Sequence, residues 1–420
     1  MAVDLAVIGL GYVGLPLSQA AADAGLSVLG LDIDKAVVDG LNAGVSHVDD
    51  VADADVQRML AAGFRATTDE AELTQAATIT VCVPTPLSED GGPDLAAVRA
   101  AILATSRHLR RGTLVVLEST TYPGTTDEVV RPLLESSGLV AGRDFHLAFS
   151  PERVDPGNPG FGVTNTPKVV GGQTPACTER AAAFYGRFID TVVTARGTRE
   201  AETAKLLENT YRHVNIALVN EMARFCHELD IDLWDVIRCA ATKPFGFHAF
   251  RPGPGVGGHC IPIDPNYLSH NVRARLGYSF RFVELAQEIN ASMPAYVVQR
   301  IQNMLNAVRL PLNGANVLLL GVTYKPDIAD QRESPAVPLA KHLAAKGAVV
   351  TYHDPHLETW RINGTELTGV DDLGAALADA DVAVLLQGHS CYLDTDLSSQ
   401  ARRLLDTRGV LPAAPGVERL

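Results

Sequence analysis

Residues 3–32 of this 420-residue chain read VDLAVIGLGYVGLPLSQAAADAGLSVLGLD, and this stretch decides the fold. The apolar run over residues 3–9 ends at a glycine and predicts a buried strand. An alanine-rich helix is expected over 15–24, Gly25 ends it, and residues 26–31 form a second apolar run. A strand, a helix and a strand within about 30 residues make a βαβ unit, which is typical of a parallel sheet.

The turn between the first strand and the helix carries the glycine pattern GxGxxG. Gly9 permits the tight turn, Gly11 lets a pyrophosphate approach the backbone, and Gly14 lets the helix pack closely on the strand. We therefore expect this loop, with Tyr12 and Val13 inside it, to bind a dinucleotide.

An acidic residue ends the second strand. Asp32 stands where a carboxylate can accept a hydrogen bond from a ribose 2′-hydroxyl and would repel a 2′-phosphate, so NAD is favoured over NADP. Lys35 follows shortly after, and either contact with the adenosine or a solvated position fits its place.

Similar apolar runs continue through the first half of the chain. They occur at residues 78–83, 113–118, 145–149 and 168–171. Helical patterns over 94–109 and 127–135 lie between them. This alternation predicts a mostly parallel sheet with helices on both faces.

The pattern changes after residue 197. Apolar residues at steps of three and four predict one long amphipathic helix over 200–229, and another is expected over 282–305. A loop dense in glycine and proline spans 251–265 between them.

A second α/β region begins after the Asn313-Gly314 turn. Strands are expected at 317–321, 349–353 and 382–386, with a helix over 335–346, whereas residues 411–420 show no pattern and are expected to fray. The predicted α/β architecture is an N-terminal doubly wound Rossmann domain (1–198), a central helical segment (199–308) and a Rossmann-like C-terminal domain (309–420).

Composition excludes several classes of protein. There are 35 basic and 49 acidic residues, a net charge of −14, which argues against a nucleic-acid or membrane-surface partner. No apolar run reaches the roughly 18 residues of a membrane span. The six cysteines are dispersed without metal-ligand spacing, so no metal site is expected and a soluble cytoplasmic protein with reduced thiols is the default.

One cysteine stands apart from the others. Cys260 follows paired glycines in the rigid loop, where a thiolate nucleophile is plausible, whereas Cys82, Cys226 and Cys239 fit buried inert thiols. His259 could act as a base, although a loop histidine beside glycine more often faces solvent.

The long helix adds a polar pair. Lys205 and Asn209 are four residues apart and therefore share one face of the helix, from which both could reach a common oxygen atom. A solvated lysine with a polar neighbour would have the same spacing.

The chain resembles the UDP-glucose/GDP-mannose dehydrogenase family through eight ordered motifs that run to about His389. These are Gly9–Gly14, Val83-Pro84-Thr85-Pro86, Glu118-Ser119-Thr120, Ser150-Pro151-Glu152-Arg153, Lys205-Leu206-Leu207-Glu208-Asn209-Thr210, Gly257-Gly258-His259-Cys260, Gly321-Val322-Thr323-Tyr324-Lys325 and Arg332-Glu333-Ser334-Pro335.

The resemblance implies a four-electron oxidation. A nucleotide sugar's C6 alcohol becomes a carboxylate with two NAD⁺ reduced, and Cys260 holds the aldehyde as a thiohemiacetal that is oxidised to a thioester and hydrolysed. Lys205 and Asn209 would stabilise the oxyanion at C6. Asp264, Thr120 and Glu152 match positions that hold the catalytic water and assist proton transfer, and which of them is the base stays open.

The resemblance also implies ligand contacts and assembly. Thr85 and Thr120 match positions near NAD, and Arg332 matches a residue that reaches the cofactor or nucleotide region. Positions that contact the sugar nucleotide, in addition to Lys205 and Asn209, are matched by Arg153, Val154, Arg212, Gly257 and Lys325. The long helix over 200–229 would form part of the core of a homodimer or a higher homo-oligomer.

The sugar is less well defined. Relatives that act on UDP-glucose carry an Asp-Pro-Arg segment where this chain has TKPFGF at 242–247, with no arginine before Arg251. The segments 243–247, 252–265 and 332–335 most resemble those of UDP-N-acetylglucosamine 6-dehydrogenases, with the N-acetylmannosamine and N-acetylgalactosamine enzymes as near neighbours. An N-acetylhexosamine is therefore placed ahead of UDP-glucose.

Two other classes of function compete with this interpretation. A nucleotide-sugar epimerase also binds NAD at a glycine loop, but it relies on a YxxxK pair that this chain lacks in the corresponding region and has no need of Cys260. A non-catalytic regulator that binds NAD or a nucleotide sugar would have no reason to retain Lys205, Asn209, Cys260 and Asp264.

The cysteine assignment predicts the behaviour of one variant. Cys260→Ser should slow the second oxidation or the hydrolysis, because an alkoxide replaces the thiolate nucleophile, and a trapped covalent adduct is the expected sign. Mass spectrometry of the reacting enzyme would detect the adduct. Full turnover by this variant would remove Cys260 from the mechanism.

Overall fold

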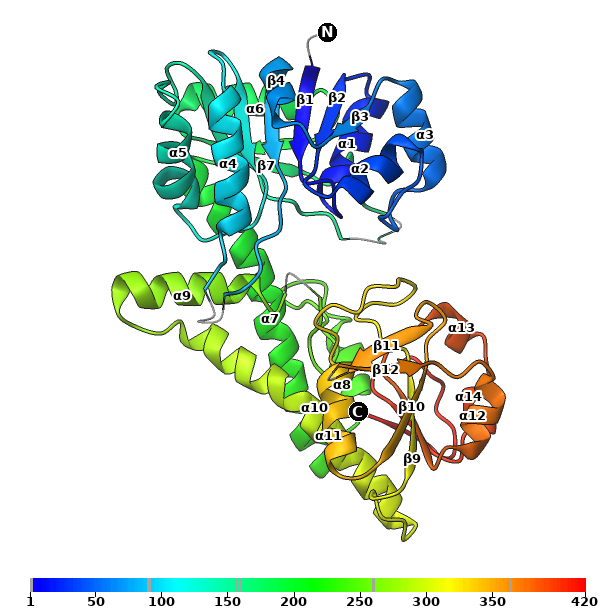
Figure 1. Cartoon of the computed structure of the whole chain (residues 1–420). Coiled ribbons are helices and arrows are strands. Elements are labelled where there is room, and N and C mark those ends of the chain that lie inside the picture. The colour runs from blue at the N-terminus through cyan, green and yellow to red at the C-terminus, as the bar shows by residue number, and fades with distance from the viewer. Residues whose placement is uncertain (1–2, 89–91, 156–157, 159, 259–260, 363) are drawn as a thin grey trace. The chain divides into compact units, whose positions relative to one another are not determined.

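A computed structural model describes residues 3–88, 92–155, 158, 160–258, 261–362 and 364–420. The chain divides into two compact units (Figure 1). Unit 1 comprises Met1–Glu208 and Asn266–Gly277, and unit 2 comprises Asn209–Pro265 and Tyr278–Leu420. Each unit is built around its own parallel sheet.

Unit 1 contains an eight-stranded sheet. Its strands are β1 (Val3–Ile8), β2 (Val28–Leu31), β3 (Arg65–Thr67), β4 (Ala76–Val81), β5 (Leu114–Leu117), β6 (His146–Phe149), β7 (Lys168–Gly172) and β8 (Val192–Thr194). The order is β3-β2-β1-β4-β5-β6-β7-β8, and β6 with β7 is the antiparallel pair. The order 3-2-1-4-5-6 of the first six strands is that of a Rossmann sheet, which confirms the predicted fold class.

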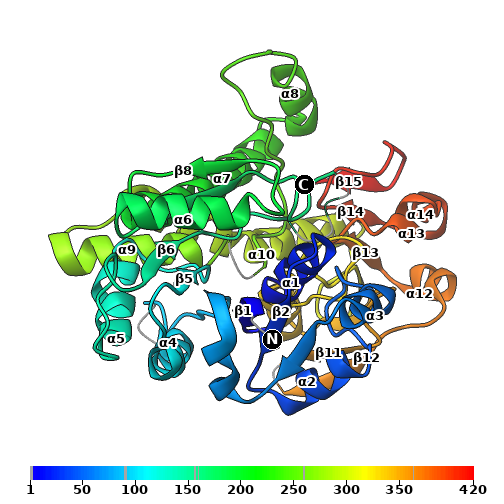
Figure 2. The ribbon, with the colours of Figure 1, turned by 90° about the horizontal axis from the view of Figure 1, so that it is seen from above.

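Helices cover both faces of this sheet. They are α1 (Gly14–Asp23), α2 (Lys35–Asn42), α3 (Asp53–Ala61), α4 (Ala96–His108), α5 (Arg131–Glu135) and α6 (Pro175–Tyr185), with short helices η1 (Glu70–Gln75) and η2 (Thr126–Val130). Figure 2 shows α4 and α5 on the face opposite α6. Leu5 and Val7 of β1 are buried in the cluster with α1 and α6, whereas Ala6 and Ile8 are buried with α4 and α5. This alternation follows from the two-residue period of a strand.

Four helices make up the middle of the chain. They are α7 (Thr198–Glu228), α8 (Leu233–Ala240), α9 (Asp264–Leu276) and α10 (Arg281–Ala307). The long helices α7 and α10 extend the predicted ranges by a few residues. Most of α9 belongs to unit 1, where Tyr267 donates a hydrogen bond to the Thr85 carbonyl and Arg275 pairs with Glu128. Among the described residues, no helix has both the length and the apolar character of a membrane span.

Unit 2 contains a five-stranded parallel sheet. Its strands are β9 (Asn316–Leu320), β10 (Val349–His353), β13 (Val382–Leu385), β14 (Leu404–Asp406) and β15 (Val417–Arg419). They lie in the order β10-β9-β13-β14-β15, the 2-1-3-4-5 order of a doubly wound fold, which confirms the predicted second α/β domain. The remaining elements are the hairpin β11 (Thr359–Ile362) and β12 (Thr365–Thr368), and the helices α11 (Ala336–Ala345), α12 (Leu373–Asp379), α13 (Ser390–Leu393) and α14 (Leu397–Gln400).

The end of the chain is ordered, so the expectation that residues 411–420 fray is wrong. Strand β15 pairs with β14 as an edge strand of the sheet. Leu420 is buried in the core of unit 2, and its carbonyl accepts a hydrogen bond of 2.9 Å from Trp234 Nε1. A three-residue strand has no periodicity that could be recognised in the sequence, because its pairing with β14 alone defines it.

Candidate active site

The glycine loop has the close packing that its sequence predicts. Gly9 has φ of +90°, and a Cβ added at Gly14 would lie 1.9 Å from the Gly9 carbonyl oxygen. A Cβ added at Gly11 would meet no atom within 4 Å, so this glycine borders open space. Helix α1 starts here without a side-chain cap at Val13. The N–H groups of its first turn therefore suit a diphosphate.

The carboxylate of Asp32 is held in place at the end of β2. Its Oδ2 accepts a hydrogen bond of 2.8 Å from the Leu10 N–H of the glycine loop, and its Oδ1 accepts one of 2.9 Å from the Asp34 N–H. Each oxygen keeps a further lone pair with which it could accept a ribose hydroxyl. Lys35 lies on the exposed side of α2 and pairs with Asp39 at 2.6 Å.

The ends of β4 and β5 are joined by the two threonines that the sequence singles out. Thr85 Oγ1 donates a hydrogen bond of 2.8 Å to the Thr120 carbonyl. Thr85 is buried and Thr120 is half-buried. The two residues therefore lie together beyond the carboxyl ends of neighbouring parallel strands, which is where ligands bind in such sheets.

Glu152 lies beyond the end of β6 and is almost fully engaged. Its Oε1 accepts hydrogen bonds from the N–H groups of Arg153 at 2.8 Å and Val154 at 2.6 Å, and its Oε2 lies 3.3 Å from Lys168 Nζ. Burial opposes the charge of Glu152, but Lys168, the two N–H groups and Lys205 together hold its pKa below the usual value. The carboxylate is therefore a proton acceptor at neutral pH.

Arg153 makes contacts of its own in unit 1. Its guanidinium pairs with Glu208 of α7 at 2.8 Å and donates a hydrogen bond of 2.6 Å to the Pro167 carbonyl. The side chain therefore joins the loop after β6 to α7.

Helix α7 carries the predicted polar pair. Asn209 Nδ2 donates a hydrogen bond of 2.6 Å to Asp264 Oδ2, and both side chains are buried. Lys205 is half-buried one turn earlier on the same helix, and Arg212 is exposed one turn later. The structure thus brings Asn209 and Asp264 together across 55 residues of sequence.

The predicted nucleophile Cys260 and its neighbour His259 lie outside the described residues. The glycines before them pack tightly in unit 2: a Cβ added at Gly257 would lie 2.7 Å from Tyr324 Cβ, and one at Gly258 would lie 2.8 Å from the Tyr324 ring. Gly258 has φ of +88° and donates a hydrogen bond of 3.2 Å to the Arg332 carbonyl. The motifs that start at Gly257, Gly321 and Arg332 therefore meet in one place.

The other cysteines fit the prediction only in part. Cys226 is buried and Cys82 is half-buried, and burial raises the pKa of the Cys82 thiol well above its usual value. Cys239 is exposed, so its assignment as a buried thiol is wrong. The reason is that Cys239 lies on the solvent side of the short helix α8, near Asp235 and Arg238.

The strand order of unit 2 points to a ligand crevice. Its direction changes between β9 and β13, and ligands of doubly wound sheets bind beyond the carboxyl ends of the strands at such a point. The loop after β9 carries Lys325, whose carbonyl accepts a hydrogen bond of 3.0 Å from Thr323 Oγ1. Arg332 lies further along the same connection, where its guanidinium makes a bidentate pair with Asp330.

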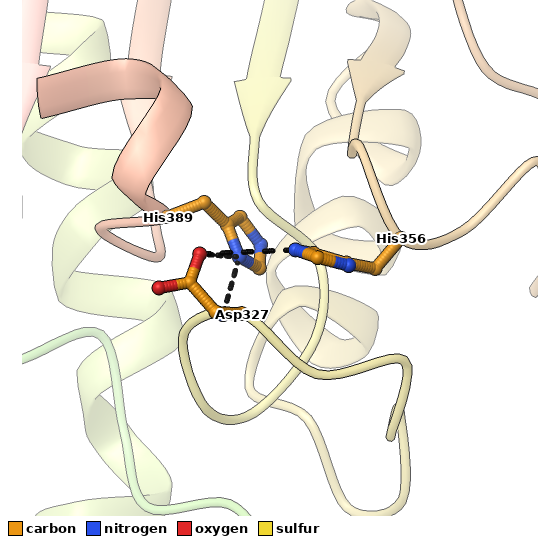
Figure 3. A group of neighbouring side chains, drawn as sticks. All are labelled: Asp327, His356 and His389. Atoms are coloured by element: carbon orange, nitrogen blue, oxygen red, sulfur yellow. Dashed lines mark hydrogen bonds and ion pairs between the residues drawn. The ribbon is translucent and has the colours of Figure 1, made fainter. Parts of the chain in front are cut away.

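Three potential metal ligands gather beside this crevice: Asp327, His356 and His389, whose donor atoms lie within 4.8 Å of one another (Figure 3). His389 Nδ1, however, accepts the Asp327 N–H at 2.8 Å, and its Nε2 lies 3.2 Å from Asp354. The Asp327 carboxylate accepts two hydrogen bonds from Ser390. These side chains therefore join loops through hydrogen bonds that occupy both nitrogens of His389.

Two features near the predicted residues carried no clear sequence signal. Ile33 is fully exposed directly after Asp32, where a flat apolar surface suits an adenine ring, and an apolar residue inside the polar turn IDIDK is the sign that could have found it. Lys168 contacts Glu152, but a lysine at the start of an apolar strand does not indicate where its ammonium lies.

Comparison with known proteins agrees with this geometry. Family models of the UDP-glucose/GDP-mannose dehydrogenase family match the chain in order: the NAD binding domain over 3–189, the central domain over 199–292 and the UDP binding domain over 318–413. The chain belongs to this family. It is therefore an NAD-dependent oxidoreductase that acts on a CH–OH group of a nucleotide sugar, and it carries the family's UDP binding domain.

Individual dehydrogenases are similar over their whole length. The UDP-N-acetyl-D-mannosamine dehydrogenase of Salmonella typhi is 36% identical over 97% of this chain and 98% of its own. The NDP-N-acetyl-D-galactosaminuronic acid dehydrogenase of Ralstonia solanacearum is 34% identical over 97% and 96%. The solved UDP-D-ManNAc dehydrogenase of Pyrococcus horikoshii matches with a TM-score of 0.90 at 31% identity, covering 99% of this chain and 98% of its own.

The open space at Gly11 gives a test of the dehydrogenase's cofactor loop. Gly11→Ala should weaken NAD binding by about tenfold or more while leaving the melting temperature unchanged, because its methyl group would occupy space that only a pyrophosphate needs. Calorimetric titration with NAD and thermal unfolding measure the two effects. Gly14→Ala is the contrast, since its methyl group would strike the Gly9 carbonyl and should lower stability as well. Unchanged NAD affinity in Gly11→Ala would contradict the assignment.

Proposed function

We propose that this dehydrogenase oxidises the C6 alcohol of a UDP-N-acetylhexosamine twice, to the uronate, with Cys260 as the nucleophile. The overall change converts one alcohol, one water and two NAD⁺ into one carboxylate, two NADH and three protons. When bound, NAD accepts the hydride of each oxidation. We place the reaction in the cytoplasm, and the free state of the cysteines that the structure describes supports this compartment.

The hydrogen bond between Asn209 and Asp264 is the observation that carries the proposal. An amide donor 2.6 Å from Asp264 Oδ2 favours the ionised acid, which can accept a proton from water or a hydroxyl. Asp264 stands four residues after Cys260, and Lys205 stands one turn before Asn209. An acceptor, a neutral donor and a cation in this sequence relation suit the formation and hydrolysis of a thioester.

Each residue has a proposed role in this scheme. The Cys260 thiolate adds to the aldehyde, and this bond keeps the reactive aldehyde from escaping before the second oxidation. Lys205 and Asn209 stabilise the oxyanion on C6. Glu152 and Asp264 hold the water that cleaves the thioester and accept its proton, which releases the uronate and restores the thiol.

The choice of hexosamine rests on two lines of support. Motif likeness favours UDP-N-acetylglucosamine, whereas the similar proteins of Salmonella typhi and Pyrococcus horikoshii are named for N-acetylmannosamine and that of Ralstonia solanacearum for N-acetylgalactosaminuronic acid. We infer that the acetamido group at C2 is the common feature and place UDP-N-acetylmannosamine first among the substrates to be tested.

A substrate panel tests the proposal. Purified protein is given NAD⁺ with UDP-ManNAc, UDP-GlcNAc, UDP-GalNAc or UDP-glucose, NADH is followed by absorbance, and the product is identified by mass spectrometry. We expect two NADH for each uronate formed from an N-acetylhexosamine and little turnover of UDP-glucose. One NADH per sugar, with a free aldehyde or a ketone as product, would contradict the twofold oxidation.

We also propose that the chain forms a homodimer through α7. Leu218 and Phe225 are exposed and seven residues apart on this helix, so they form an apolar stripe on one side of it. Replacing both by glutamate should convert the dimer into a monomer, since two charges cannot be buried in an apolar contact. Light scattering measures the mass, and circular dichroism reports whether the helices persist. A monomeric wild-type protein would contradict the proposal.

A further inference from the structure

A buried cluster of charged and polar side chains lies at the carboxyl edge of the unit 1 sheet. Glu118 follows β5 and Glu152 follows β6, and because these strands are parallel both residues leave the sheet at the same edge. Strand β7 runs antiparallel to β6, so its first residue, Lys168, is brought to that edge as well. Tyr185 reaches the same place from the end of α6.

The contacts within the cluster centre on the ammonium group. Lys168 Nζ lies 2.7 Å from Glu118 Oε2 and 3.3 Å from Glu152 Oε2. The Tyr185 hydroxyl donates a hydrogen bond of 2.5 Å to the other oxygen of Glu118, and Lys168 Nζ lies 5.4 Å from the centre of the Tyr185 ring. One cation thus serves two carboxylates.

The two carboxylates differ in their surroundings. The side chain of Glu118 is fully buried and that of Lys168 is 5% exposed, whereas that of Glu152 is 16% exposed. Burial raises the pKa of Glu118 in spite of Lys168, with the neighbouring Glu152 adding to the rise, whereas the pKa of Glu152 is lowered. An ion pair of Lys168 and Glu118 with the Tyr185 hydrogen bond would already satisfy the buried charge. The contact with Glu152 is additional, and among the three charged side chains it is the one nearest solvent.

We propose that Lys168 is a positioning residue that keeps the Glu152 carboxylate ionised and in a single orientation, with Glu118 and Tyr185 anchoring its ammonium group. The inference rests on the proposed function, in which Glu152 holds water and accepts a proton. Two backbone N–H groups fix one oxygen of Glu152, and the ammonium draws the other toward the sheet. A fixed, charged carboxylate is what a proton acceptor near neutral pH requires.

Other charged or titratable groups face Glu152 as well. Lys205 of α7 lowers its pKa from a second side, and the guanidinium of the adjacent Arg153 is paired with Glu208. Cys82, after β4, interacts electrostatically with the cluster, but burial raises the pKa of its thiol, so it adds no charge near neutral pH. Lys168 is therefore the cation in printed ion-pair contact with Glu152 among the described residues.

The test compares two variants that differ only in this cation. Glu118→Gln keeps Lys168 facing Glu152, whereas the double variant Glu118→Gln/Lys168→Gln removes the cation without leaving Glu118 charged and buried. This design avoids the single variant Lys168→Gln, in which an unpaired buried carboxylate could prevent folding. Lys168→Arg is the conservative variant that retains the charge.

Two readouts are used for each folded variant. The pKa of Glu152 is measured by titrating ¹³C-labelled glutamate carboxyls by NMR, with the Glu152→Gln protein identifying the signal. The acid limb of the kcat–pH profile is measured with the substrate found in the panel. Thermal unfolding and NAD affinity confirm that each variant is folded.

We expect the pKa of Glu152 to be higher by about one unit or more in the double variant than in Glu118→Gln, since an opposite charge at this distance lowers a carboxyl pKa by that amount. The acid limb should move to higher pH with it, kcat at pH 6 should fall by at least about tenfold, and Lys168→Arg should stay near the wild type. A purely structural role would change stability in both Glu118 variants without separating their Glu152 titrations.

The outcomes separate the two proposals. Equal Glu152 pKa values in the two Glu118 variants would overturn the role of Lys168 even if the enzyme is active. Wild-type turnover that survives Glu152→Gln would overturn it as well. If no UDP-sugar is oxidised by any protein, the proposed function fails, and the NMR titration still decides whether Lys168 controls the charge of Glu152.

Discussion

The parallel alignment of β1, β4, β5 and β6 is the constraint on which the rest of unit 1 depends. Parallel strands end at one edge of a sheet, so the loops that follow them are gathered there however far apart they lie in the sequence. The glycine loop, the two threonines and Glu152 all follow strands at this edge. Each is then fixed by short contacts, as the Thr85 hydroxyl is by the Thr120 carbonyl.

Unit 2 repeats this principle with a different strand order. Its sheet changes direction between β9 and β13, and the loop with Lys325 leaves the sheet at that point. The glycines before Cys260 pack on Tyr324 of the same loop, with no room for a side chain. The sequence around the cysteine and the UDP binding domain are thereby joined by packing, which explains why glycine is required at both positions.

The acidic composition and the anionic ligands of this family are reconciled by local chemistry. A net charge of −14 gives no general attraction for a diphosphate. Instead, the first turn of α1 offers uncapped N–H groups beside Gly11, and cations such as Lys325 lie at particular loops. Several arginines are already paired, as Arg153 is with Glu208 and Arg332 with Asp330, so their donors are oriented rather than diffuse.

The sequence by itself determined the βαβ unit, the glycine loop, the acid at Asp32, both long helices and the family, because these depend on local periodicity and on motifs of adjacent residues. It indicated Lys205 with Asn209 from helical spacing alone. It did not indicate β15, the exposure of Cys239 or the ammonium of Lys168 beside Glu118 and Glu152. Those were decided only by the tertiary structure, since a three-residue edge strand is defined by its partner, the solvent side of α8 by what packs against it, and the place of Lys168 by the antiparallel return of β7.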